Sequence, residues 1–67
     1  MHIEVRTVEL RRLKGWSQNE LARQSGVSQS TISRIEAGDT SGVALGAIEA
    51  LAEALDVDPS VLIRKRQ

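Results

Sequence analysis

The sequence predicts an all-α domain of five short helices, and three features of its 67 residues indicate this fold class. Apolar residues recur at the three- and four-residue spacing of helices rather than in strict alternation. Gly15, Gly26 and Gly38 each follow a short periodic segment, where a left-handed residue commonly ends a helix. Residues with capping side chains open the segments that follow. We expect a single domain, 1–67, with its core over 8–63.

The first two helices are predicted at about 7–14 and 18–25. The run Ser-Gln-Asn-Glu that starts at Ser17 is a capping box, in which Ser17 caps the helix and Glu20 reaches back. Trp16, just before the cap, is expected to pack against Leu21. The opening "HIEVR" fits either an extended segment or a frayed first turn, and the sequence leaves both open.

The third helix is predicted at about 29–37, with Ser28 as its N-cap. Only "SGVS" separates it from the second helix, and so short a connection with a glycine predicts a helix-turn-helix at about 18–37. Ala22 is small enough to let the two helices approach each other, and Gly26 can adopt the positive φ that the turn needs.

The remaining two helices lie in the second half of the chain. "ALGAIEALAEALD" is strongly periodic, and Asp58 before Pro59 starts a short fifth helix. Because Ala44 has no capping side chain, we expect Thr40 or Ser41 to cap the fourth helix. The apolar residues expected to face the core are Leu45, Ile48, Leu51, Ala52 and Leu55 of the fourth helix, and Val61, Leu62 and Ile63 at the fifth.

The third helix has an outward face made of short polar side chains. On a helical wheel Ile32 and Ile35 mark the buried side. The opposite side and its flanks carry Gln29, Ser30, Thr31, Ser33 and Arg34. Solvated helix faces usually carry Glu and Lys, which favour helix, whereas hydroxyl side chains weaken it. These side chains are suited to hydrogen-bonding base edges and phosphates, so the face predicts nucleic-acid binding.

Charge and composition exclude several classes of protein. The nine basic and nine acidic residues give a net charge of zero. All charged residues of the segment 39–58 are acidic, however, so the molecule is dipolar. The chain has no Cys and one His, His2, which argues against an enzyme and predicts no metal and no cofactor. There is no apolar run of membrane-spanning length, and the N-terminus lacks the apolar core of a signal peptide. We therefore expect a cytoplasmic protein.

The stretch "LRRLKGWSQNELARQSGVSQSTISRIEAG" followed by "ALGAIEALAEALDVDPSVL" resembles the phage-repressor/Cro type of helix-turn-helix domain, the XRE family. The resemblance covers roughly residues 8–63. It implies a lambda-repressor-like fold whose third helix reads the major groove of double-stranded DNA. It also implies a repressor-like regulator of transcription that acts as a homodimer on a palindromic operator. Such a protein would be encoded by a bacterium or a phage and would be associated with the nucleoid in the cytoplasm.

The resemblance assigns roles by position. Gln29, Ser30 and Arg34 would lie at or near the bases, flanked by Ser28 and Thr31. Gln18 would bind a phosphate and pack against Gln29, in agreement with its place at the start of a helix. Arg11 and Glu36 would form an internal ion pair. After Gly38 the family's basic loop is replaced by "DTSGVA", and because Asp39 repels phosphate, only Thr40, Ser41 or backbone N–H groups are expected to contact DNA there.

One alternative from another class stays open. The domain would then be an antitoxin-type or protein-interaction module whose main role is to bind a partner protein. Val57, Val61 and Ile63 either form an exposed apolar patch for such a partner, or for a second copy of the chain, or fill the core.

Overall fold

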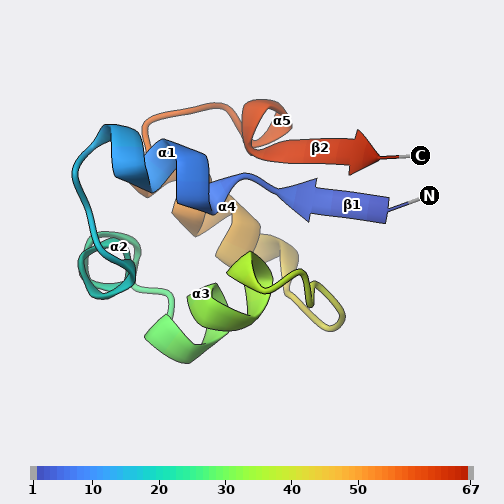
Figure 1. Cartoon of the computed structure of the whole chain (residues 1–67), viewed down its shortest axis with the longest axis horizontal. Helices are drawn as coiled ribbons and strands as arrows, with labels where there is room; N and C mark the ends of the chain where they lie inside the picture. Colours follow the sequence, from blue (N-terminus) through green and yellow to red (C-terminus); the bar gives the residue numbers. More distant parts are fainter. Residues whose placement is uncertain (1, 67) are drawn as a thin grey trace.

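The computed structural model describes residues 2–66, and the side chains of residues 4–63. The described residues form five helices, labelled in Figure 1, and the predicted all-α class is confirmed. The helix bounds differ from the expected ones by one or two residues at most. In chain order they are α1 (Thr7–Leu13), α2 (Gln18–Ser25), α3 (Gln29–Glu36), α4 (Leu45–Ala54) and α5 (Pro59–Leu62).

A two-stranded antiparallel ribbon joins the two ends of the chain. Strand β1 (His2–Val5) pairs with β2 (Ile63–Arg66), so that Val5 lies opposite Ile63 and His2 opposite Arg66. The backbone N–H of Arg6 extends the pairing with a 2.9 Å bond to the carbonyl of Leu62. The opening segment is therefore extended, and Figure 1 shows the two strands side by side. Strand β2 was not predicted, because four residues carry too little periodicity and the partner strand is remote in sequence.

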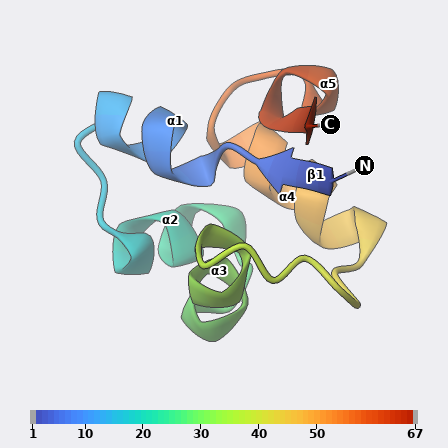
Figure 2. The same cartoon turned by 45° about the vertical axis from the view of Figure 1, so that its right-hand side comes forward.

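The buried apolar side chains form one cluster, to which β1 and the helices α2 to α5 contribute, and Leu10 of α1 packs against it. Leu21, Ile32, Leu51 and Leu62 are fully buried, one from each of α2, α3, α4 and α5. Val5 adds a residue from β1. Figure 2 shows how α2 and α3 lie beneath α1, with α4 behind β1. The core therefore fixes α3 from its inner side and leaves its outer side uncovered.

Two apolar predictions are wrong. Leu45 is 69% exposed, because it is the first residue of α4 and lies beyond the point where the other helices cover it. Val61 is 46% exposed, since in the single turn of α5 only Leu62 points into the core. Val57 and Ile63 are half-buried against the cluster, so they fill the core rather than form an exposed patch.

Two capping predictions need correction. Ser17 caps α2 by accepting a 3.1 Å bond from the N–H of Glu20, but the carboxylate of Glu20 accepts from Gln24, so the second half of the capping box is missing. No side chain caps α4, whose N-cap is Ala44. Thr40 and Ser41 are separated from that helix by a turn in which the N–H of Val43 bonds the carbonyl of Thr40 at 3.3 Å.

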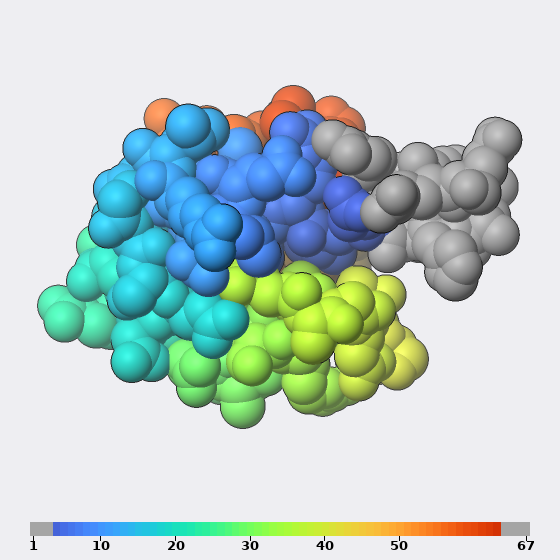
Figure 3. Space-filling model, viewed as in Figure 1, coloured from blue at the N-terminus to red at the C-terminus, as the bar shows by residue number. Residues whose placement is uncertain are grey.

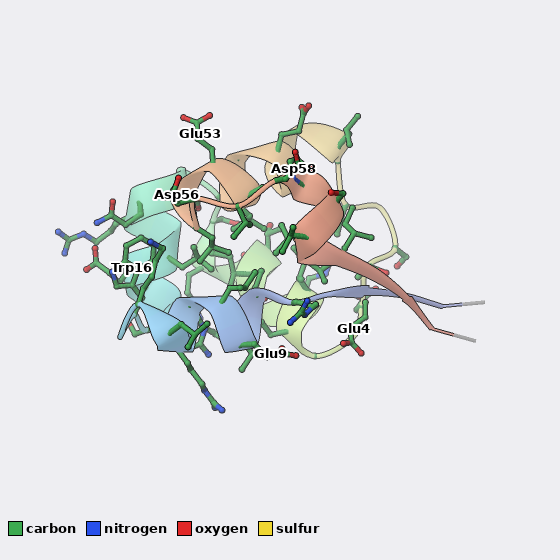
Figure 4. All side chains as sticks on the ribbon, turned by 90° about the horizontal axis from the view of Figure 1, so that it is seen from above. Glu4, Glu9, Trp16, Glu53, Asp56 and Asp58 are labelled. Carbon is green, nitrogen blue, oxygen red and sulfur yellow. The ribbon has the colours of Figure 1, made fainter. Side chains whose placement is uncertain are left out.

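The acidic residues of the second half gather along the helices that follow the helix-turn-helix. In Figure 4 the labelled side chains of Glu53, Asp56 and Asp58 lie along the α4–α5 side of the molecule. The side chain of Asp58 caps α5 by accepting from the N–H of Ser60 at 2.9 Å. This arrangement keeps most of the negative charge of segment 39–58 away from α3.

Candidate nucleic-acid interface

The helix-turn-helix is built by α2, α3 and the three residues between them. Gly26 has φ +77°, and its N–H bonds the carbonyl of Ala22 at 2.9 Å, which ends α2. The hydroxyl of Ser28 then accepts from the N–H of Thr31 at 3.2 Å and starts α3. The view of Figure 1 looks along α2 while α3 runs across it. The turn therefore presents α3 as a separate ridge.

The predicted polar residues of α3 lie on its uncovered side. Ile32 and Ile35 are buried, at 0% and 2% exposure, and Thr31 is half-buried. The exposed members are Ser28, Gln29, Ser30, Ser33 and Arg34. In Figure 3 the green surface of α3 forms the lower edge of the molecule, between α2 and the loop that follows α3. The uncovered side of α3 is thus a ridge of polar side chains that another molecule can contact.

The Ser28 hydroxyl is already engaged inside the protein. Besides capping α3, it lies 2.8 Å from the hydroxyl of Thr31 and 3.4 Å from that of Ser30. These contacts order the hydroxyl groups at the start of the ridge. They leave Ser28 mainly a capping residue, and Ser30 and Ser33 the exposed hydroxyl groups on the ridge itself.

A chain of amide hydrogen bonds ties Gln29 to the interior. The amide nitrogen of Gln18 donates to the Glu36 carboxylate at 2.9 Å, which leaves the amide oxygen of Gln18 facing outward. That oxygen accepts a 2.8 Å bond from the amide nitrogen of Gln29. Gln29 keeps one N–H and its amide oxygen free of these contacts. Such a pair of groups is what adenine recognition in the major groove requires.

The chain of amides begins at a buried ion pair. Arg11 donates from Nε and Nη2 to the two Glu36 oxygens, each at 2.9 Å, and from Nη1 to the carbonyl of Trp16 at 3.1 Å. The Arg11 and Glu36 side chains are 13% and 6% exposed. This pair fixes α3 to α1 and to the segment before α2, and through Gln18 it also fixes Gln29. Arg11 and Glu36 are therefore scaffold residues.

The environment of Glu36 favours its charged form. Burial by itself would raise the pKa of this carboxyl group, but hydrogen bonds from Arg11 and Gln18 and the positive charge of Arg11 together lower it below the ordinary range. The buried hydroxyl of Thr7 contributes in the same direction, although it has no partner within ordinary hydrogen-bond geometry. The same contacts with Glu36 raise the pKa of Arg11.

Arg34 contacts the loop that follows α3. Its Nε lies 3.4 Å from the Asp39 carboxylate, and Nη2 donates to the carbonyl of Ser41 at 3.1 Å. The other carboxylate oxygen of Asp39 accepts from both the N–H and the hydroxyl of Ser41, at 3.2 and 2.7 Å. The hydroxyl of Ser41 is therefore used within the loop, and Thr40 is half-buried. The loop offers fewer free groups than the sequence predicts.

Sequence reasoning missed the role of Asp39 as a partner of Arg34. The signal lay in Gly38, which has φ +93° and ends α3 in a Schellman motif. In that motif the N–H of Asp39 bonds the carbonyl of Arg34, here at 2.9 Å, which brings the two residues side by side.

The surface beside α3 is lined mainly by small and apolar residues. An open groove of about 450 Å³ runs beside α3 towards the start of α4. Arg34 is the one ionisable residue among those lining it, and the others are mostly Gly, Ala and Val. Among the described side chains no cluster of three or more His, Cys, Asp or Glu could hold a metal ion. Within residues 2–66 no helix has the length and hydropathy of a membrane span.

Comparison with known proteins identifies the family. A family model described as helix-turn-helix matches residues 9–62. The chain belongs to this helix-turn-helix family. The match spans the ion pair, the amide chain and the ridge of α3, and it confirms the resemblance to the phage-repressor/Cro type. No curated protein matches the chain.

Two solved structures are similar to this helix-turn-helix protein. A hypothetical transcription factor, NHTF from Neisseria, is 41% identical with a TM-score of 0.76, over 84% of this chain and 62% of that one. The restriction-modification controller protein C.AhdI from Aeromonas hydrophila is 44% identical with a TM-score of 0.77, over 85% of each chain. The chain thus spans less than two thirds of the Neisseria protein. Neither description is that of an enzyme or an antitoxin.

Proposed function

We propose that the protein is a regulator of transcription that binds double-stranded DNA sequence-specifically, with α3 in the major groove. The observation that carries the proposal is the hydrogen-bonded chain from Glu36 through Gln18 to Gln29. Through this chain an internal carboxylate orients an exposed side chain of α3. A merely solvated helix face has no need of such an arrangement, whereas readout of a base edge requires a fixed amide.

The ridge divides into groups that select bases and groups that hold phosphates. Gln29 and Arg34 are the base readers, with Ser30, Ser33 and Thr31 as shorter contacts around them. Gln18 lies in the first turn of α2, where free N–H groups favour a phosphate. Two similar proteins, described as a transcription factor and a controller protein, support the proposed role in regulation.

We infer that the protein acts as a homodimer and represses transcription. One helix-turn-helix covers one half-site, and two copies would read half-sites about 34 Å apart on a palindromic operator. Val61, exposed on α5, offers apolar surface for the second copy. Such a protein would work in the bacterial cytoplasm, at the nucleoid.

Selection of bound sequences from random duplex DNA, at two salt concentrations, tests the proposal. We expect a palindromic motif and an affinity that falls with salt. Gln29→Ala and Arg34→Ala should each relax the preference at one or two base pairs, at a cost of about 1–3 kcal/mol. Gln18→Ala should weaken binding to all sequences through the lost phosphate contact and, because Gln18 orients Gln29, should also relax the preference at the base pair that Gln29→Ala identifies. As a control, Glu49→Gln on the exposed side of α4 should leave the motif unchanged. If the wild-type protein enriched no sequence, the proposal would be wrong.

A further inference from the structure

We propose that Asp39 is a specificity-determining residue that positions Arg34 for base readout, although Asp39 itself does not contact DNA. This inference rests on the proposed function. If Asp39 had no positioning role, it would only be an unfavourable acid on the loop beside the DNA-binding helix, where basic residues bind phosphates better.

The first support is the place of Asp39 in the fold. The end of α3 is closed by two bonds of the Schellman motif, from the N–H of Gly38 to the carbonyl of Ile35 at 3.0 Å and from that of Asp39 to Arg34 at 2.9 Å. This motif commonly brings together apolar side chains at the positions that Arg34 and Asp39 occupy. In this chain an ion pair replaces the apolar contact, so the backbone itself holds the acid beside the arginine.

The second support is the part of Arg34 that the loop occupies. A guanidinium group has five N–H donors. Asp39 and the carbonyl of Ser41 take one from Nε and one from Nη2. Both hydrogens of Nη1 and one of Nη2 stay available at the end of the side chain. Those two nitrogens form the fork that binds the O6 and N7 atoms of guanine. The loop thus restrains Arg34 without covering its reading edge.

The third support is that Asp39 is itself restrained. The oxygen that does not face Arg34 accepts from the N–H and the hydroxyl of Ser41, at 3.2 and 2.7 Å. These bonds, with the nearby charge of Arg34, lower the pKa of Asp39, so the carboxylate is ionised at neutral pH. A carboxylate free to rotate would not orient its partner.

The exposure of the pair excludes a main role in stability. The Arg34 and Asp39 side chains are 55% and 52% exposed, and ion pairs with that much solvent contribute little to folding. What the pair does provide is a restricted set of Arg34 conformations before DNA arrives. Restricting them lowers the entropy lost on binding and penalises bases that do not fit the held geometry.

The test uses the operator found with the wild-type protein and its set of single-base substitutions. Arg34→Ala first identifies the base pair that Arg34 reads. Asp39→Asn, which keeps the shape and removes the charge, should reduce discrimination at that same base pair by about tenfold. Because a phosphate-repelling charge is lost, its affinity for unrelated DNA should rise. Glu49→Gln removes one exposed acid elsewhere and controls for net charge.

The outcomes separate the two proposals. Asp39→Asn should fold normally, with a melting temperature within about 4 °C of wild type. In the Arg34→Ala background, Asp39→Asn should change no base preference further. Unchanged discrimination in Asp39→Asn, or loss at a different base pair, would overturn the inference while DNA binding stands. The inference would also be overturned if Arg34→Ala changed the preference at no base pair of the operator. Failure of the wild-type protein to bind any duplex would instead refute the proposed function.

Discussion

Among substitutions of side chains that solvent can reach, replacing Arg11 by Met should destabilise the protein most. It leaves the Glu36 carboxylate charged and nearly without partners. The substitution removes two 2.9 Å bonds to Glu36 and the 3.1 Å bond to Trp16. The Glu36 side chain is 6% exposed, so water replaces these bonds poorly, and Gln18 is the residue that still donates to it within ordinary hydrogen-bond geometry.

The size of the effect follows from that burial. Removing one partner of a buried ion pair costs about 3–5 kcal/mol. Arg11 is 13% exposed, so some water reaches the pair and about 3 kcal/mol is the better figure. A chain of 67 residues has a free energy of unfolding of about 3–10 kcal/mol. The variant should therefore lose about 30% or more of its free energy of unfolding.

Urea unfolding followed by circular dichroism at pH 7 measures this loss. Arg12→Met is the matched control, because Arg12 is the exposed neighbour in α1, and its change should stay within about 0.5 kcal/mol. The double variant Arg11→Met, Glu36→Leu removes both charges and should recover most of the loss. The reasoning is refuted if Arg11→Met costs no more than Arg12→Met, or if the double variant is the least stable of the set.

Three further predictions concern stability. The pKa of Glu36 is lowered in the folded protein, so ionised Glu36 should contribute fully to the free energy of unfolding above the ordinary pKa of 4.5. That contribution should be lost as the pH falls through the lowered pKa. Thermal melts from pH 7 to 2 should show the loss, and the melting temperature should fall less in Glu36→Gln. Thr7→Val replaces a buried hydroxyl that has no ordinary partner, and should be neutral or stabilising by about 1 kcal/mol in urea unfolding; a clear loss would mean that the hydroxyl supports Glu36. Gly26→Ala should cost about 1 kcal/mol of stability, because φ at this position is +77°. Gly46→Ala should stabilise by about 0.5–1 kcal/mol, because Gly46 lies in the first turn of α4 with open space around it. Thermal melts would contradict this pair of predictions if both substitutions shifted the melting temperature in the same direction.

The helices and the ridge of α3 could be predicted because their signals are local. Ser17 and Ser28 cap the helices that they precede, and Ile32 and Ile35 set the orientation of α3 through its period. The Arg11–Glu36 pair followed from the family resemblance. Each of these features depends on residues within a few positions of one another or on a shared pattern.

What the sequence did not reveal depends on contacts between distant or irregular segments. Strand β2 exists because β1 is beside it, and neither is periodic enough to be recognised alone. The exposure of Leu45 depends on where the neighbouring helices end, which its spacing does not report. The contact between Asp39 and Arg34 depends on the conformation of Gly38, so the same acid that looked unfavourable for DNA binding has a partner in the fold.

The ribbon of β1 and β2 also has a consequence for the order of folding. The helix-turn-helix can close early, because its residues are near one another in sequence and helical contacts form fast. The ribbon joins segments that are separated by nearly the whole described chain, so its closure has the largest entropic cost and few local contacts to guide it. Pairing of the strands should therefore come last. In native-state hydrogen exchange their amides should exchange before those of α2 and α3, and the surface that we propose reads DNA should remain formed when the chain ends separate.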